Sequence, residues 1–354
     1  MNKNVLILIF AIILVGRVEY SEAITTIFDE ERGNIYIGGG DMARILLYKD
    51  NIRKTTFRNK VYRLSLEDEK AHLIVETKDR ILSLKVRKSL LVVAEINLDG
   101  EPGKDHRSLL LYDKKGMLLK TIDGVVLSTS SDTYSLSPDG TEIAYLTGNK
   151  LYETRKPFDP TGVWIYNVKN NETKKIAGGG YEIKWSDHDN KIYIRDNYRD
   201  PTRMSIYDTN KGVLSKSTHK GLLFSGDGKH YVGVQAENIM DVDADTPVFY
   251  IFDSTTNKKI HQFKIGEYSA RIDWYGYGAF IKRSNHILIW GSYAKGKYKL
   301  FDVDTKQTIR ESKSHLLGWN EDMTKLIVYE GGGKQIHIEE TLTGKRLKSL
   351  DIPK

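Results

Sequence analysis

Residues 134–146 read YSLSPDGTEIAYL: an apolar strand, a tight reversal and a second apolar strand. The reversal contains Pro138, Asp139 and Gly140, residue types that supply the backbone angles of a short turn. The pattern recurs clearly in 182–194, 222–234 and 316–329, and more weakly in 25–37, 63–75 and 270–280. A strand pair joined by a tight turn is therefore one repeating unit of this chain.

A second strand pair follows the first, and its leading strand ends in an aromatic residue. The copies occupy 45–57, 109–122, 163–176, 204–217, 249–263, 299–312 and 336–350. Six of them carry what we call the marker aromatics: Tyr48, Tyr112, Tyr166, Tyr207, Phe252 and Phe301. The markers are separated by 64, 54, 41, 45 and 49 residues. Four strands in a unit of about forty to fifty residues is the period of a propeller blade. The sequence predicts an all-β propeller, most simply of seven blades of four antiparallel strands.

The blade count depends on how one irregular interval is divided. The 64 residues from Tyr48 to Tyr112 include 63–75 and a further strand pair at 81–86 and 90–96. The interval holds either one irregular blade or an eighth, incomplete one, so counts of six and eight stay open. Paired β-sandwiches are the other all-β arrangement that short strands allow. Apolar residues do not follow a sustained helical spacing anywhere, which argues against a helical domain.

The first 23 residues differ from the rest of the chain. Lys3 precedes the apolar run VLILIFAIILVG at 5–16, and Ser21 and Ala23 are the small residues that a cleavage site requires. The run is too short to span a bilayer as a helix. We predict a signal peptide at 1–23, a single propeller domain at 24–354, and a periplasmic or secreted protein. An uncleaved anchor and a buried first strand are the alternatives.

Composition excludes several kinds of chemistry. The chain contains no Cys, so it has no disulfide, thiolate zinc site or cysteine nucleophile. Lys and Arg number 54 against 47 Asp and Glu, a net charge of +7, and the two signs are interspersed. A nucleic-acid binder concentrates its basic residues on one element, so we predict no nucleic-acid partner. Nucleophile elbows, phosphate loops and HExxH zinc motifs do not occur in the sequence.

One copy of the repeat carries a family resemblance. The string SPDGTEIAY at 137–145 resembles the repeat signature of the TolB-type, WD-like propellers of bacterial envelopes. Trp185-Ser186, the segment 224–228 and Trp319-Asn320 are similar but degraded copies. The resemblance implies a propeller that serves as a platform for other proteins. The chain departs from the TolB pattern because its repeats begin near Ile24, without a separate α/β domain before them.

The loops that join the second and third strands of each blade are long and irregular. They cover 97–107, 147–162, 197–203, 236–247 and 292–297, with short glycine-rich ones at 38–44 and 331–335. In a meander of four strands these loops share one face, and long loops on a rigid framework commonly bind ligands. The predicted binding residues are Arg and aromatic types, which dominate interface energetics: Arg107, Tyr152, Arg155, Phe158, Tyr198, Arg199, Arg203 and Tyr293.

One of these loops is acidic and is a candidate calcium site. Asp241, Asp243 and Asp245 alternate as in a calcium loop, but Thr246 and Phe252 stand where an EF-hand has Gly and Glu. We predict no other cofactor. The function predicted is an exported, non-enzymatic scaffold that binds a protein or polysaccharide of the cell envelope through the loop-rich face. The alternative is a propeller enzyme of lactonase, lyase or glycan-processing type, with its site at the mouth of the central channel.

Overall fold

The computed structural model describes the residues of all the strands and of many of the turns between them. The described ranges are 26–29, 34–38, 59–65, 67, 71–88, 90–96, 107–113, 115–127, 133–148, 160–186, 189–196, 203–219, 221, 223–225, 227–233, 248–264, 278–280, 284–290, 298–312, 314–320, 322–330 and 335–351. Within these ranges every regular element is a β-strand. The expectation of an all-β chain is confirmed.

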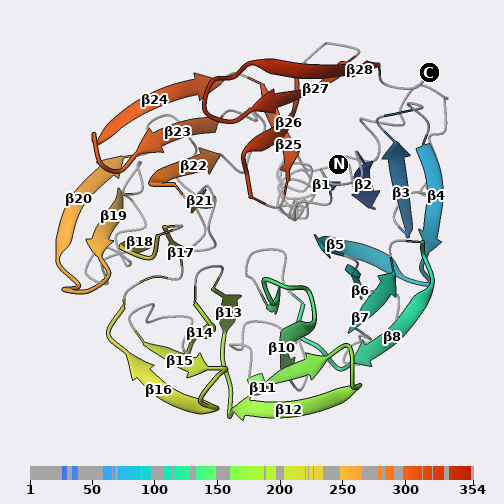
Figure 1. Ribbon diagram of the computed structural model, residues 1–354. Coiled ribbons are helices and arrows are strands. Elements are labelled where there is room, and N and C mark those ends of the chain that lie inside the picture. Colours follow the sequence, from blue (N-terminus) through green and yellow to red (C-terminus); the bar gives the residue numbers. More distant parts are fainter. Residues whose placement is uncertain are drawn as a thin grey trace, which may run out of the picture.

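Twenty-eight strands among the described residues form seven four-stranded sheets, each made of consecutive strands (Figure 1). The first three sheets contain β1 (Thr26–Asp29), β2 (Asn34–Gly38), β3 (Lys60–Ser65), β4 (Ala71–Glu76); β5 (Arg80–Arg87), β6 (Leu90–Ile96), β7 (Arg107–Asp113), β8 (Leu118–Asp123); and β9 (Tyr134–Leu136), β10 (Glu142–Gly148), β11 (Pro160–Asn167), β12 (Glu172–Ala177). The fourth sheet contains β13 (Glu182–Trp185), β14 (Lys191–Arg195), β15 (Met204–Asp208) and β16 (Val213–Ser217).

The last three sheets continue the same order. They contain β17 (Leu223–Phe224), β18 (His230–Gly233), β19 (Val248–Asp253), β20 (Lys259–Lys264); β21 (Gly278–Phe280), β22 (His286–Trp290), β23 (Tyr298–Asp302), β24 (Gln307–Ser312); and β25 (His315–Trp319), β26 (Lys325–Tyr329), β27 (Gln335–Glu340), β28 (Arg346–Asp351). The sheets are arranged as blades around a central axis, and β25 lies beside β1 to close the ring (Figure 1). The seven-bladed propeller predicted from the repeats is confirmed.

Because each blade is an antiparallel meander, its connections alternate between the two ends of the ring. The turns between first and second strands and between third and fourth strands share one end, which we call the turn end. The loops between second and third strands lie at the other, which we call the loop end. The tight turn at 137–141 and the Asp-containing turns after the marker aromatics are therefore at the turn end.

The first blade differs from its predicted division. Its outer strand pair is β3 and β4, whereas we expected 45–57 to form that pair and 63–75 to open another blade. Residues 45–57 lie outside the described residues. The marker misled because the equivalent position in the first blade is aliphatic: Leu64 pairs with Ile35 as Tyr112 pairs with Leu91. The strands at 81–86 and 90–96 belong to β5 and β6, which begin the second blade, so no eighth blade exists among the described strands.

The residue after each marker aromatic shapes the next turn. In five blades it is Asp or Asn, and its side-chain oxygen accepts hydrogen bonds from backbone N–H groups of the turn. The five are Asp113, Asn167, Asp208, Asp253 and Asp302. These bonds between a side-chain oxygen and the turn's backbone N–H groups stabilise the chain reversal where strand-to-strand hydrogen bonds end. They explain why Asp follows the aromatic residue in most copies.

The blades are held together by apolar packing between neighbouring sheets and by one recurring contact. One buried cluster joins the second and third blades, and another joins the third and fourth. At the outer wall, a fourth-strand side chain lies against the marker aromatic of the next blade. Lys120 Nζ is 5.9 Å from the centre of the Tyr166 ring, and Lys174 Nζ is 5.6 Å from the centre of the Tyr207 ring. Each contact adds a cation–π attraction across a blade boundary.

Candidate functional site

The structure describes two of the eight predicted binding residues, Arg107 and Arg203. The other six lie outside the described residues: Tyr152, Arg155, Phe158, Tyr198, Arg199 and Tyr293. The three predicted calcium ligands also lie outside them: Asp241, Asp243 and Asp245. The structure therefore describes the bases of the loops at the loop end. The bases considered below are those in the second, third and fourth blades.

Arg107 anchors a loop base in the second blade. It begins β7 and is buried, with only 5% of its surface exposed. Its guanidinium donates a hydrogen bond of 2.9 Å to the carbonyl oxygen of Leu127, in the segment that leads into the third blade. The arginine thus ties the end of the 97–107 loop to the neighbouring blade. A direct contact with a partner stays a prediction.

Carboxyl groups lie close to Arg107 at the same end of the second blade. Glu95 is buried beside the backbone N–H of Asp79, at 3.4 Å, and burial raises the pKa of its carboxyl. The nearby charges of Asp79 and Asp123 raise it further. Ser108 Oγ donates a hydrogen bond of 2.7 Å to Asp123. Burial therefore makes the ionised form of Glu95 less favourable, relative to the neutral form, than it is in an exposed glutamate.

In the third blade, an aromatic side chain secures the base of the 147–162 loop. The Trp164 indole N–H donates to Thr147 Oγ1 at 3.0 Å. Lys175 lies over the indole ring, at 5.7 Å from its centre, and donates to the carbonyl oxygen of Thr161 at 3.0 Å. The two strands that carry the loop are therefore fixed side by side. Sequence reasoning singled out the loop but not Trp164, although a Trp beside a loop is a common interface residue.

A buried ion pair lies at the loop end of the fourth blade. Glu182 and Arg195 are cross-strand partners at the ends of β13 and β14, and their side chains form a salt bridge that is almost completely buried. Neither Glu182 nor Arg195 is among the residues predicted from the sequence. The signal was available, because the 182–194 hairpin places its first residue opposite the residue that follows its last. Buried charged pairs contribute little net stability, so their presence at a loop end is a pointer to function.

The 197–203 loop of this blade is closed at its base. The backbone N–H of Asp196 donates to the carbonyl oxygen of Arg203 at 2.8 Å. Ser205 Oγ donates to the Asp196 carboxylate at 2.9 Å. Burial raises the pKa of Asp196, and Ser205, Lys216 and Arg203 partly oppose that effect. Arg203 itself is exposed at the rim.

At the turn end, the pKa values of three carboxyl groups are lowered, in contrast to those of Glu95 and Asp196. Asp139 accepts hydrogen bonds from Ser137 Oγ at 2.7 Å and from the N–H of Thr141 at 3.1 Å. Its burial would raise the pKa, but these bonds outweigh it and lower the pKa to about 2. The pKa values of Asp227 and Asp253 are lowered by similar turn contacts. Turn contacts thus lower the pKa of these three carboxyl groups, whereas burial raises the pKa of Glu95 and Asp196 at the loop end.

The Asp139 turn predicts an acid sensitivity. Because the pKa of Asp139 is lower in the folded chain than in the unfolded chain, its contribution to stability is present above about pH 4 and is lost as the pH falls through about 2. We expect Asp139→Asn to lower the melting temperature at neutral pH and to match the wild type near pH 2. Thermal unfolding followed by circular dichroism between pH 7 and 2 measures this, with Glu67→Gln, an exposed acid, as the control. A constant difference at every pH contradicts it.

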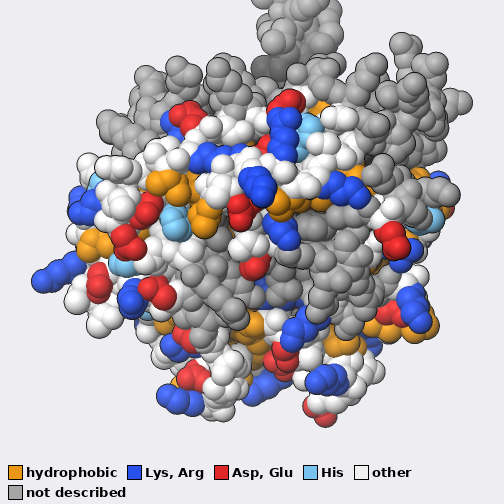
Figure 2. Space-filling view, turned by 45° about the horizontal axis from the view of Figure 1, so that its top comes forward, with side chains coloured by type: hydrophobic (Ala, Val, Ile, Leu, Met, Phe, Trp, Pro, Cys, Tyr) orange, Lys and Arg blue, Asp and Glu red, His pale blue; other side chains and the backbone are white. Residues whose placement is uncertain are grey.

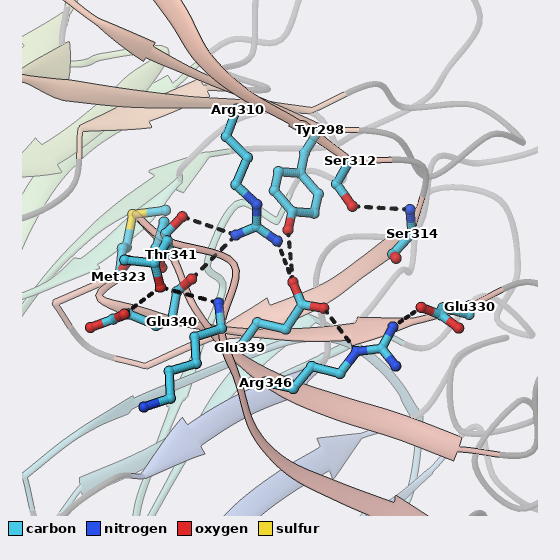
Figure 3. Close-up of polar contacts among 12 residues, drawn as sticks. Tyr298, Arg310, Ser312, Ser314, Met323, Glu330, Glu339, Glu340, Thr341 and Arg346 are labelled. Atoms are coloured by element: carbon cyan, nitrogen blue, oxygen red, sulfur yellow. Dashed lines mark hydrogen bonds and ion pairs between the residues drawn. The ribbon is translucent and has the colours of Figure 1, made fainter.

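A second group of buried charges lies at the outer wall between the sixth and seventh blades (Figure 3). Glu339 occupies the position of the marker aromatic in the seventh blade and forms a salt bridge with Arg310 of β24. The Tyr298 hydroxyl also donates to Glu339, at 3.2 Å, and burial raises the pKa of Tyr298 to about 12. Arg310 donates further to the carbonyl oxygens of Glu340 and Thr341. This network stands where Tyr166 and Tyr207 make their cation–aromatic contacts in the third and fourth blades.

Positive and negative side chains are intermingled over the described part of the face seen in Figure 2. Within the described residues, no group of three His, Asp or Glu side chains is arranged to hold a metal ion. The described part of the chain contains no helix long and apolar enough to cross a bilayer.

Comparisons with known proteins agree with the fold. No protein-family model matches the chain, and no curated protein matches it significantly. Among solved structures, the chain is similar to one in "Crystal Structure of Mitotic Checkpoint Complex", with a TM-score of 0.54, 10% identity and 91% of each chain covered. It is also similar to one in "Crystal structure of RRP9 WD40 repeats", with a TM-score of 0.53, 9% identity and 86% of each chain covered. The chain is a seven-bladed β-propeller with structural neighbours among WD40-repeat proteins.

Proposed function

We propose that this propeller is a protein-binding scaffold whose partner docks on the loop end of the second, third and fourth blades. The observation that carries the proposal is the distribution of buried charge. Four of the six buried acidic, basic or histidine residues among those described lie at this end: Glu95, Arg107, Glu182 and Arg195. Buried charged groups add little net stability, so stability by itself does not explain them. Such groups are common at binding interfaces and active sites.

The loop bases support the same proposal. Side chains hold the roots of three successive loops: Arg107 in the second blade, Trp164 in the third and the Asp196–Arg203 pairing in the fourth. Fixed roots reduce the entropy that a loop loses when it binds, so less of the contact energy is spent on ordering it. The WD40-repeat neighbours favour a protein as the partner.

The proposed location, envelope role, second class of partner and calcium site rest on the sequence. An exported, periplasmic or secreted scaffold is supported by the signal-peptide pattern at 1–23, and a TolB-type envelope role by the motif at 137–145. An envelope polysaccharide is the second class of partner we propose. Calcium at Asp241, Asp243 and Asp245 is a further proposal, and a calcium titration monitored by melting temperature tests it. An unchanged melting temperature contradicts the calcium site.

The test of the scaffold is affinity capture from an envelope extract with residues 24–354 as bait. The variant reverses Arg155, Arg199 and Arg203 to Glu. We expect it to lose the captured partner, because like charges across an interface repel. We also expect it to keep the wild-type melting temperature, because Arg203, the one of the three that the structure describes, is exposed and surface substitutions have little effect on folding.

The matched control reverses three exposed turn-end lysines to Glu: Lys115, Lys258 and Lys345. It changes the net charge of the chain by the same amount at the opposite end of the ring. We expect the control to retain the partner. Loss of the partner from both variants would show a nonspecific charge effect, and retention by both would exclude the loop end as the binding face.

A further inference from the structure

The boundary between the seventh and first blades differs from the other six in how the chain runs. Each described sheet is made of four consecutive strands, and no described sheet combines strands of the first and seventh blades. At the other six boundaries the chain runs from the fourth strand of one blade to the first strand of the next, through segments such as 77–79 and 178–181. A connecting segment limits how far two blades can separate, because an extended chain has a fixed reach. No described segment joins β28 to β1.

At four of those six boundaries, a Lys, His or Arg side chain of the fourth strand contacts the marker position of the next blade. In each case this residue is the strand partner of the residue before the marker of its own blade. The four contacts are Lys120–Tyr166, Lys174–Tyr207, His261–Phe301 and Arg310–Glu339. Cation–π, stacking and ion-pair contacts all require a ring or a charge at the marker position.

The marker position of the first blade cannot make such a contact. It is occupied by Leu64, which is buried and has neither a ring nor a charge. On the other side of the boundary, the equivalent residue of β28 is Lys348, which pairs with Ile338. Lys120 pairs in the same way with Leu111. Among the described residues, the inner strand β25 lies beside β1, so the ring is closed there by packing of inner strands and without the marker contact (Figure 1).

We propose that the propeller opens reversibly between its seventh and first blades while the other six boundaries stay closed. A boundary with no described connecting segment and no marker contact needs the least free energy to separate, and a folded protein populates its least costly local openings. A partner that contacts both the first and the seventh blade binds the closed ring better than the open one, and so increases the closed population. The inference is independent of the proposed function, whose partner docks on the second, third and fourth blades.

The first measurement uses single thiols, because the chain contains no cysteine of its own. Leu64→Cys is compared with Phe301→Cys, which has the marker position at the boundary of the fifth and sixth blades; both native residues are 5% exposed. Mass spectrometry follows the reaction of the full folded chain with N-ethylmaleimide, and each rate is divided by that of the same variant unfolded in urea. We expect the ratio for Leu64→Cys to be about tenfold higher or more. The larger cavity left by Phe301→Cys acts against this result.

The second measurement tests whether whole blades separate. Double electron–electron resonance on Glu67→Cys/Lys345→Cys, both spin-labelled, measures the distance between the turns before the fourth strands of the first and seventh blades. Each control pair shares one of these labels. Thr305→Cys/Lys345→Cys crosses the boundary of the sixth and seventh blades, and Glu67→Cys/Lys115→Cys crosses that of the first and second. All four native residues are exposed. We expect a second, longer distance in the first pair and a single distance in both controls.

Three outcomes overturn the inference. The first is an equal rate ratio for the two thiols, or a higher one for Phe301→Cys. The second is a higher ratio for Leu64→Cys with a single distance in all three labelled pairs, because the thiol is then exposed by local fraying of β3. The third is a second distance in either control pair, which shows that the movement is not confined to the boundary of the seventh and first blades.

Discussion

Replacing Glu339 with Gln will destabilise the propeller by about 3 kcal/mol, the lower end for breaking a buried ion pair, because Arg310 then remains inside without its counter-charge. The exposed fractions of the two side chains are 16% for Arg310 and 6% for Glu339. Chemical denaturation with urea, followed by fluorescence, measures the free energy of unfolding. The slight exposure of Arg310 is the reason for choosing the lower figure.

The same blade offers a matched control. Glu330 forms an ion pair with Arg346, and each side chain is 48% exposed. Arg346 Nε also lies 3.7 Å from Glu339, so Glu330→Gln removes the exposed end of the same network and leaves the buried Glu339–Arg310 pair intact. We expect Glu330→Gln to cost no more than about 1 kcal/mol, as exposed pairs do. The double variant Arg310→Met/Glu339→Leu should be more stable than Glu339→Gln, because it removes both charges together. Equal losses for Glu339→Gln and Glu330→Gln would contradict the importance of burial here (Figure 3).

The second large effect is expected at Gly116, in the turn between β7 and β8. Its φ of +88° is in the left-handed region, and a Cβ at this position would overlap the carbonyl oxygen of Ile74 in the first blade. We expect Gly116→Ala to cost about 3 kcal/mol, from backbone strain together with a clash against main chain. The overlap is with backbone, so no side-chain rotation can relieve it. Thermal and urea unfolding both measure the loss.

Gly124 is a control that separates the cost of backbone strain from the cost of the clash with main chain. Its φ is +69°, yet a Cβ there would have nothing within 4 Å. We expect Gly124→Ala to cost only about 1 kcal/mol, the backbone term by itself. If the two glycine variants lose the same stability, the close approach of the second blade to the first contributes nothing.

The repeat pattern was sufficient for the architecture because each blade is a local meander. Tight turns such as the one at Asp139 and the Asp after each marker aromatic act on residues a few positions away. Because these bonds join residues close in the chain, the residue types that form them recur at fixed positions in the repeats. The pattern failed in the first blade, where Leu64 replaces the aromatic, because a buried aliphatic can fill the same space between sheets.

The predicted binding site stays a prediction. Loop length and residue type favour the loop end of the ring, and Arg203 lies exposed there. Arg107 was selected as an interface arginine, but the structure shows that its guanidinium reaches inward to Leu127. Composition cannot distinguish these roles, since the direction of a side chain depends on the strand that carries it and on the neighbouring blade.

The repeats predicted the strand pairs of the blades after the first, the turn chemistry and, as the simplest count, seven blades, because these features arise from contacts between residues close in the chain. Which charges are buried, and which groups they contact, became known from the packed blades. Glu339 pairs with Arg310, 29 residues away in another blade. The cations that oppose the rise in the pKa of Asp196 are Lys216 of β16 and Arg203, which immediately precedes β15. Burial and pairing depend on the packing of one sheet against the next, and no local pattern encodes that packing.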